Sequence, residues 1–469
     1  MLRFFRINDP VRLFALLGLL LVVRLPMFIY GSESADEANW LALGSALRLG
    51  SMYVDVWDST APISAFVYYF IVLLFGKSFL ALKIFGAIVT GIHIHLFNSI
   101  CIKNKLLGQA NYIPGFVYML FSSLHTDFMT LSPVFMGMTF ILMALNNLLS
   151  HVEFRAKRDE HLLYLGLLIG IAPLFYFPLI IFSIIILFLL LVFTNTLQRR
   201  YLLIIYGSVL PLLASYFYYW VVSDDSGYFM HHFIVPELRG SGVAVGLVEL
   251  LLVMAWPLGF SILGSFGIAA GIRLTSYQIR VVQLIALFGI ASPLLLFIAV
   301  PDIKLIYILL PAFAFFTAQL FQNIGKSLVS HILIWVFILG SFFINYNSQV
   351  RWVSWMPGGE EPLQVENTQW DEIVEEKDIL VFGSQPSLYL HGNPCTAFLD
   401  WGLSKRFFDE IGHYDNIVFL YIQIKEHPPE VIVDLENKWP EITKHLPTIA
   451  ESYKRDSDGV YVRAVNRIH

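Results

Sequence analysis

The chain has 469 residues, of which 57% are hydrophobic and only 14% are charged, and its mean hydropathy is +0.68. A soluble domain cannot bury that much apolar surface, so the composition excludes a soluble globular protein and indicates a polytopic membrane protein. The charge is uneven. Residues 346–469 hold 11 Lys and Arg against 20 Asp and Glu, an acidic balance that argues against nucleic acid as a partner.

Eleven apolar segments have about the length that a helix needs to cross a bilayer, which is roughly 20 residues. The first is long enough to be a span and is not expected to be a cleavable signal peptide. Pro173 and Pro178 are expected to break one long apolar run into two helices, because proline removes a backbone donor. The expected spans are 13–30, 81–101, 109–124, 131–149, 162–177, 178–197, 201–221, 243–271, 281–299, 303–320 and 328–345.

A further apolar segment, 62–76, is short, and the distribution of basic residues decides how it is interpreted. If it does not span, 13 of the 19 basic residues in the first 345 positions fall on one side of the membrane. The positive-inside rule then predicts a cytoplasmic N-terminus and an extracytoplasmic C-terminus. The expected location is the plasma (inner) membrane. We therefore expect 62–76 to be a helix that lies in the interface or dips into it.

The acidic tail is expected to form a separate, small extracytoplasmic α/β domain over residues 346–469, after a transmembrane domain over 1–345. Buried strands are expected at 378–383, 416–422 and 431–435, and helices at 404–413 and 439–450. Asp458–Gly459 is expected to be the turn of a closing hairpin.

The first outer loop, residues 31–62, concentrates acidic side chains beside the membrane. Asp36 and Glu37 open a stretch whose apolar residues recur at helical spacing, which predicts an amphipathic helix in the outer interface. Acids in the first turn of a helix are favoured by capping and by the helix dipole, and a polar loop is often merely solvated. A catalytic site facing a membrane-embedded substrate is the other interpretation. The acids of this loop are Glu33, Asp36, Glu37, Asp55 and Asp58.

Six segments follow one another in chain order: DEANW (36–40), YVDVWDSTAP (53–62), FGKSFLALKIFGAIVTG (75–91), HTDFMTLSP (125–133), DIKLIYILLPAFAFF (302–316) and DILVFGSQPSLYLHGNPCTAFLDW (378–401). Together they resemble the GT-C glycosyltransferases, most of all the protein O-mannosyltransferase and aminoarabinose-transferase branches. Trp40 stands where that family usually has Tyr, and Lys83 where it usually has Arg. The second outer loop, 125–133, lacks the Glu that often follows its Asp in the family, which puts a metal in doubt.

The resemblance implies an enzyme that moves a sugar, with inversion, from a polyprenyl-phosphate donor to an acceptor hydroxyl on a glycan, lipid or protein at the extracytoplasmic face. It implies that Asp36 is the catalytic base, that Glu37 positions the base or the acceptor, and that Asp127 is a second carboxylate near the sugar or acceptor. Substrate-binding candidates are Lys83, Lys304 and Arg239 for the phosphate, together with Tyr307, His231, Asp55 and Asp58. No cofactor is expected.

Two other functions fit the sequence. An inactive GT-C-like scaffold in an envelope or secretion complex would retain the same motifs. A lipid or sugar transporter would favour charges and broken helices at the membrane midplane, whereas the charges here gather at the outer surface. Within the first span, Arg24 is expected either to extend to the interface or to pair with a loop carboxylate.

Overall fold

The computed structural model describes residues 2–31, 33–154, 159–194, 198–223, 227–236, 245–269, 274–324, 328–358 and 370–464. Its contacts divide the chain into two units. Unit 1 comprises Met1–Ser32, Leu82–Ser215 and Gly242–Glu360, and unit 2 comprises Glu33–Ala81, Tyr216–Ser241 and Glu361–His469. The sequence-based division at residue 345 stays a prediction.

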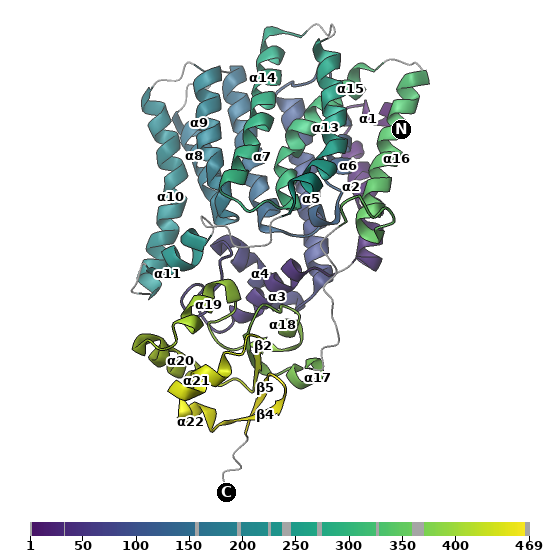
Figure 1. Cartoon of the computed structure of the whole chain (residues 1–469). Helices are drawn as coiled ribbons and strands as arrows, with labels where there is room; N and C mark the ends of the chain where they lie inside the picture. The colour runs from purple at the N-terminus through teal and green to yellow at the C-terminus, as the bar shows by residue number, and fades with distance from the viewer. Residues whose placement is uncertain are drawn as a thin grey trace. The chain divides into compact units, whose positions relative to one another are not determined.

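Helices of the membrane type make up unit 1 (Figure 1). In the described part of the chain, eight helical segments are long and apolar enough to cross a membrane. The polytopic helical fold predicted from composition is therefore confirmed. The short α1 (Leu2–Phe5) precedes helices α2 (Val11–Tyr30), α5 (Phe79–Lys103), α6 (Ile113–Phe121), α7 (Pro133–Phe154), α8 (Asp159–Ile171), α9 (Ile181–Phe193), α10 (Gln198–Ser223), α13 (Leu247–Ala269), α14 (Ser276–Ala291), α15 (Leu310–Asn323) and α16 (Leu328–Val350).

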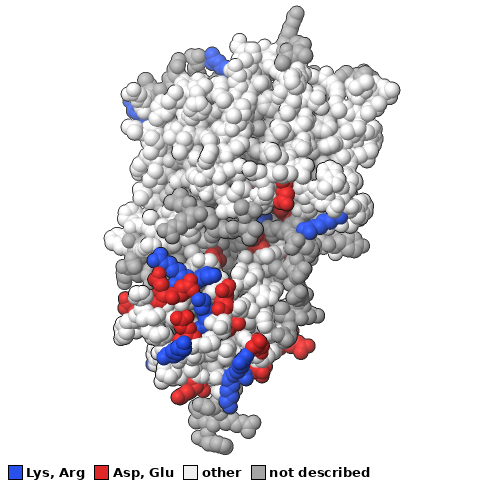
Figure 2. All heavy atoms as spheres, in the orientation of Figure 1, with Lys and Arg blue, Asp and Glu red and all other residues white. Residues whose placement is uncertain are grey.

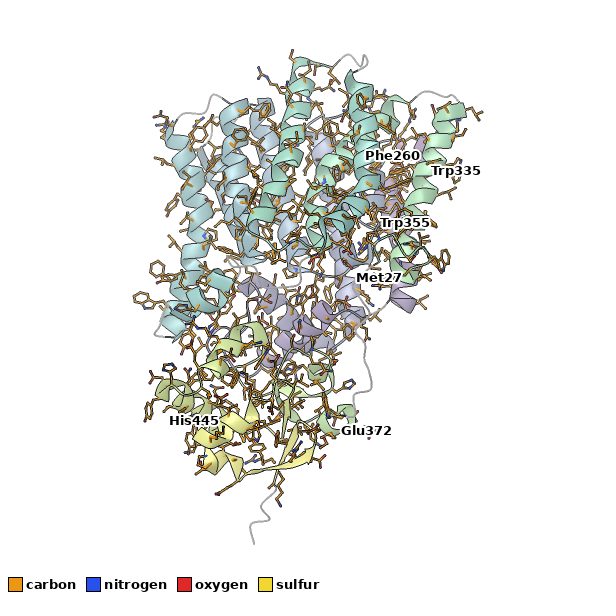
Figure 3. The ribbon with its side chains drawn as sticks, viewed as in Figure 1. Met27, Phe260, Trp335, Trp355, Glu372 and His445 are labelled. Atoms are coloured by element: carbon orange, nitrogen blue, oxygen red, sulfur yellow. The ribbon has the colours of Figure 1, made fainter. Side chains whose placement is uncertain are left out.

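The core of unit 1 lies around α15. Of the residues in the apolar stretch that contains it, 94% are buried, because α6, α13 and α14 all pack against it. Phe260 of α13 contacts Phe321 and Phe337 inside the unit, whereas Trp335 of α16 is 56% exposed and lies on an outer surface (Figure 3). An aromatic ring left exposed on a membrane helix is favoured where it meets lipid.

The predicted proline break is present. Helix α8 ends at Ile171, two 3-10 turns follow at Ala172–Leu174 and Phe177–Ile180, and α9 begins at Ile181. Pro173 and Pro178 each stand at the start of one of these turns, where a missing backbone donor costs little.

Unit 2 begins with two packed helices, α3 (Ala35–Ala46) and α4 (Pro62–Phe75). Gly44 allows the close approach, because a Cβ there would lie 2.6 Å from the carbonyl oxygen of Tyr68. With 14 residues, α4 is about 21 Å long, shorter than the roughly 30 Å of a hydrocarbon core. That length agrees with a helix that does not span, and its interfacial position stays a prediction.

The rest of unit 2 is a five-stranded sheet with the order β2-β1-β3-β5-β4. Strand β1 (Asp378–Phe382) pairs in parallel with β2 (Asn393–Pro394) and β3 (Val431–Asp434). Strands β4 (Tyr453–Ser457) and β5 (Val460–Arg463) form the closing antiparallel hairpin, with Gly459 at φ 73° in its turn. The small C-terminal α/β domain and its hairpin, predicted from the sequence, are thus confirmed.

One predicted strand is wrong. Residues 416–422 belong to helix α20 (Tyr414–Glu426), although β-branched and aromatic residues dominate them. Leu420 and Ile424, one turn apart, are its buried residues. Parallel strands need a crossover connection, and α19 (Trp401–Asp409) and α20 supply it between β2 and β3. The predicted helix 439–450 is split into α21 (Trp439–His445) and α22 (Pro447–Ala450). Other short helices of unit 2 are α11 (Gly227–Phe229), α17 (Asp371–Val374) and α18 (Leu388–His391).

The first outer loop forms part of the core of the α/β domain. Trp57 packs among buried residues that include Phe382 and Phe398, and Ala42 of α3 packs with Ile379 and Val433. Helix α3 is therefore buried over most of its surface, which corrects the amphipathic helix predicted from the sequence. The visible face of unit 2 carries many Lys, Arg, Asp and Glu side chains, whereas the visible face of unit 1 carries almost none (Figure 2).

Candidate functional site

Helix α3 carries the predicted catalytic carboxylates in its first turn. Its N-cap is Ser34, whose Oγ accepts a hydrogen bond from the N–H of Glu37, and whose own N–H donates to Glu37 Oε2 at 3.3 Å. This capping box explains the burial of Glu37, which is 2% exposed. Asp36 is half-buried and is not the capping residue of the helix. The capping explanation for an acid at this place therefore applies to Glu37 and not to Asp36.

The other two acids of the loop differ in their environments. Asp55 is exposed, and its Oδ2 accepts a hydrogen bond of 2.7 Å from the N–H of Ser51. Asp58 is half-buried and accepts a hydrogen bond of 2.7 Å from the N–H of Thr60. Burial, with the nearby carboxylate of Asp400, raises the pKa of Asp58 from 3.8 to about 7.

Asp400 ties the C-terminal segment to this loop, and sequence reasoning missed it. Its Oδ1 accepts from the N–H of Gly402 at the start of α19, and its Oδ2 accepts from Ser59 Oγ at 3.4 Å. Its own N–H donates to the carbonyl of Trp57. Burial raises the pKa of Asp400 as well. Local sequence patterns could not reveal this pair of carboxylates, because 342 positions separate Asp58 from Asp400.

The neighbouring residues His231 and His232 differ in their surroundings. His231 is exposed. His232 stacks on Trp57 with ring centroids 4.8 Å apart, and burial lowers its pKa to about 4. His232 is thus a neutral aromatic part of unit 2 at neutral pH. Arg239, predicted to bind phosphate, lies outside the described residues.

In unit 1, Lys83 stands near the start of α5 and is 5% exposed. Its Nζ donates to the carbonyl of Gly31 at 3.0 Å, just beyond the C-terminal end of α2. A lysine buried in a membrane protein is costly, and such groups are as a rule functional. The carbonyl at a helix end is a reasonable resting partner for the ammonium group.

Lys304 and Tyr307 come from one 3-10 segment, Ile303–Leu309, which Asp302 caps. Lys304 is 5% exposed, and its Nζ lies 3.5 Å from Asp302 Oδ2. Tyr307 is 1% exposed, and its hydroxyl lies 3.0 Å from Nδ1 of His93 on α5. This hydrogen bond joins the segment 303–309 to α5.

Asp127 lies in the 3-10 turn Thr126–Phe128, which packs against the segment 303–309. It is 8% exposed. Its N–H donates to His125 Nδ1 at 3.4 Å, and its Oδ2 lies 3.5 Å from the same nitrogen. His125 is 1% exposed, and among the described residues its Nε2 has no hydrogen-bond partner. His125 is a second candidate that sequence reasoning did not single out.

Arg24 fixes the segment that carries Asp127. Its guanidinium is fully buried and donates to the carbonyls of Ser122, Phe128 and Met129 at 3.1–3.3 Å. Both sequence-based expectations for Arg24, the extension to the interface and the pairing with a loop carboxylate, are replaced by this main-chain clamp. Glycine supplies a second constraint, because a Cβ on Gly86 of α5 would lie 2.5 Å from the carbonyl of Met129.

Unit 1 thus gathers several predicted residues around the segment 122–131. Arg24 and α5, which carries Lys83, contact this segment directly, and the segment of Lys304 and Tyr307 packs on its turn. Asp36, Glu37, Asp55, Asp58 and His231 belong to unit 2. Within the described residues, no group of three His, Cys, Asp or Glu side chains is arranged to hold a metal ion. The expectation that no metal is used stays a prediction.

These features define a polytopic helical membrane protein with buried cations near one end of its helices and a small α/β domain. The sequence matches no protein-family model and no curated protein. Among solved structures, ArnT from Cupriavidus metallidurans bound to undecaprenyl phosphate is similar, with a TM-score of 0.62 and 12% identity over 96% of this chain and 98% of that chain.

Two structures of the Archaeoglobus fulgidus oligosaccharyltransferase are also similar. The complex with Zn and sulfate has a TM-score of 0.49 and 10% identity over 96% of this chain and 73% of that chain. The form tethered to an acceptor peptide has a TM-score of 0.49 and 11% identity over 98% of this chain and 74% of that chain. The ArnT comparison alone carries the fold assignment: the chain has a fold similar to that of ArnT, as expected from the motifs.

Proposed function

We propose that this protein is an integral-membrane glycosyltransferase that moves a sugar from a polyprenyl-phosphate donor to an acceptor hydroxyl. The observation that carries the proposal is the pair of buried lysines, Lys83 and Lys304, around the segment of Asp127 in a chain with the fold of ArnT. The ArnT structure was solved bound to undecaprenyl phosphate, a lipid phosphate of the class proposed here.

The proposed reaction has one bond formed and one bond broken at the anomeric carbon. The acceptor oxygen attacks that carbon while Asp36 takes the hydroxyl proton. The bond from the anomeric carbon to the phosphate oxygen breaks, and its electron pair leaves with the phosphate. Attack from the face opposite the leaving group inverts the anomeric configuration. Asp36 keeps the proton until solvent removes it.

The lysines are proposed to stabilise the leaving phosphate. Negative charge grows on the phosphate as the glycosidic bond breaks, and a fixed ammonium in a water-poor site interacts strongly with that charge. Lys83 would exchange its contact with the carbonyl of Gly31 for the phosphate, and Lys304 would add its charge while Asp302 orients it. Asp127 is proposed to bind hydroxyl groups of the sugar or acceptor.

The choice of Asp36 as base has support from the residues around it. Ser34 and Glu37 form the capping box at the start of α3, so Asp36 is not the residue that caps this helix, although an acid in the first turn gains a modest dipole effect. Gly31, the partner of Lys83, precedes Asp36 by only five positions in the chain.

The deciding experiment is the Asp36→Asn substitution in the full-length protein, assayed for sugar transfer from a polyprenyl-phosphate sugar in liposomes. General-base assistance is worth roughly 10²–10⁴-fold in rate, so kcat is expected to fall by that factor with donor affinity retained. Glu33→Gln is the matched control, because Glu33 is a half-buried acid of the same loop to which no role is assigned. Transfer by the Asp36 variant within a factor of a few of the parent would remove Asp36 as base. A parent with no transfer from any polyprenyl-phosphate sugar would favour the inactive scaffold.

A further inference from the structure

The described part of unit 1 contains a pocket of about 810 Å³ that none of the proposed catalytic residues lines. It lies between the C-terminal halves of α5 and α7 and the start of α8. Its polar lining includes His95 and Lys103 of α5, Asn146 and Asn147 of α7, and Glu160 and His161 of α8. Leu96, Ile100 and Met143 add apolar wall.

Helix geometry separates this pocket from the proposed phosphate-binding lysines. Lys83 and Lys103 stand 20 residues apart on the continuous helix α5, which corresponds to roughly 30 Å along its axis. That distance is about the thickness of the hydrocarbon core of a bilayer. The pocket therefore lies at the level of the lipid headgroups in the opposite leaflet.

We infer that the pocket binds a membrane phospholipid whose headgroup carries both a phosphate and an ammonium group. Lys103 supplies a cation for the phosphate, at the last residue of α5. Glu160 supplies an anion for the ammonium group, across the pocket on α8. A lining with both charges suits a zwitterionic headgroup better than an acidic one, which Glu160 would repel.

Two further observations point to a bound headgroup rather than to a merely hydrated helix end. His95 is exposed although it lies two turns below Lys103, roughly 12 Å deeper in the membrane, where a polar ring needs a polar partner. Among the described residues, Asn146 forms one side-chain hydrogen bond, in which its Oδ1 accepts from Nδ2 of Asn104 at 2.9 Å. Its amide N–H groups are therefore available to a phosphate oxygen.

The pocket also combines a polar mouth with an apolar wall, as a phospholipid requires. Leu96, Ile100 and Met143 continue from the polar lining along α5 and α7. The glycerol and the first methylenes of an acyl chain would contact them. A free phosphate ion would use the same cation and amides but would leave this wall in contact with water.

Native mass spectrometry of the full-length protein in detergent tests the inference, with dioctanoyl phosphatidylethanolamine, dioctanoyl phosphatidylglycerol and inorganic phosphate as probes. One phosphatidylethanolamine is expected to bind about tenfold more tightly than phosphatidylglycerol. Lys103→Gln is expected to weaken that binding by about tenfold, the usual effect of losing one charge-assisted hydrogen bond. Glu160→Gln should abolish the preference between the two lipids.

Lys105→Gln is the matched control, because Lys105 is exposed close to Lys103 but does not line the pocket. Equal affinity of the Lys103 and Lys105 variants for phosphatidylethanolamine would overturn the inference. So would phosphatidylglycerol binding as tightly as phosphatidylethanolamine in the parent, or displacement of the lipid by inorganic phosphate. The readout is binding without any sugar donor, so its outcome does not depend on the proposed glycosyl transfer.

Discussion

Replacing Asp58 by Asn is expected to stabilise unit 2 near neutral pH. The carboxylate of Asp58 is half-buried beside that of Asp400, and its pKa is raised from 3.8 to about 7 by burial and by that neighbour. Asn keeps the oxygen that accepts the N–H of Thr60 at 2.7 Å but removes the charge. The substitution therefore removes an unfavourable charge and preserves the hydrogen bond that holds the loop.

The direction of the pH effect follows from the raised pKa. Between pH 4 and pH 7 the folded protein keeps a proton on Asp58 that the unfolded chain releases, so the stability of the parent falls as the pH rises through this window. A pKa raised from 3.8 to about 7 corresponds to about 4 kcal/mol in the free energy of unfolding. Because solvent reaches the half-buried carboxylate, we expect about 2 kcal/mol.

Thermal unfolding of the full-length protein in detergent measures this effect, with tryptophan fluorescence as the probe. Trp57 and Trp401 lie in the core beside the two carboxylates. For a domain of the size of unit 2, about 2 kcal/mol corresponds to a rise in Tm of roughly 4–8 °C. The rise is expected at pH 8, and at pH 4 it should be small, because Asp58 is then protonated in the folded protein and about half protonated in the unfolded chain.

Asp55→Asn is the control, because Asp55 is exposed on the same loop and makes a comparable hydrogen bond to a backbone N–H. Its Tm should stay within about 1 °C of the parent at both pH values, the usual range for surface substitutions. If Asp58→Asn and the parent gave parallel curves of Tm against pH, the two carboxylates would not interact as described.

Three further predictions concern unit 1 and the topology. Lys83→Ala should raise KM for the lipid donor by about tenfold or more, whereas Lys83→Arg should retain most affinity. Equal KM values for all three forms would remove Lys83 from the proposed phosphate site. Arg24→Leu should lower the free energy of unfolding by about 3 kcal/mol, because three buried carbonyls lose their donor, and Arg24→Lys should lower it less. The measurement is Tm, and an unchanged Tm for Arg24→Leu would contradict the clamp. In intact cells, an impermeant thiol reagent should label Lys454→Cys but not Gln109→Cys, and the reverse pattern would invert the proposed orientation.

Local sequence signals predicted much of the fold. The lengths of the apolar segments predicted the membrane helices, because a bilayer sets one minimum length for every span. Pro173 and Pro178 predicted a break, and Asp458–Gly459 predicted the closing turn, because each restricts the backbone without help from distant residues. The same reasoning wrongly predicted a strand at 416–422, because the helical form of this segment depends on the sheet that it crosses.

The candidate site, like the fold, was predicted from the sequence only in part. By itself, the sequence determined which residues carry charge beside or within apolar segments, since a buried charge is costly wherever the chain places it: Asp36, Lys83, Asp127 and Lys304. Only the tertiary structure decided their partners. Arg24 binds carbonyls about 100 positions away, and Asp58 meets Asp400 from the other end of the chain. The physical reason is that a hydrogen bond or a pKa depends on distance in space, which local sequence patterns do not encode.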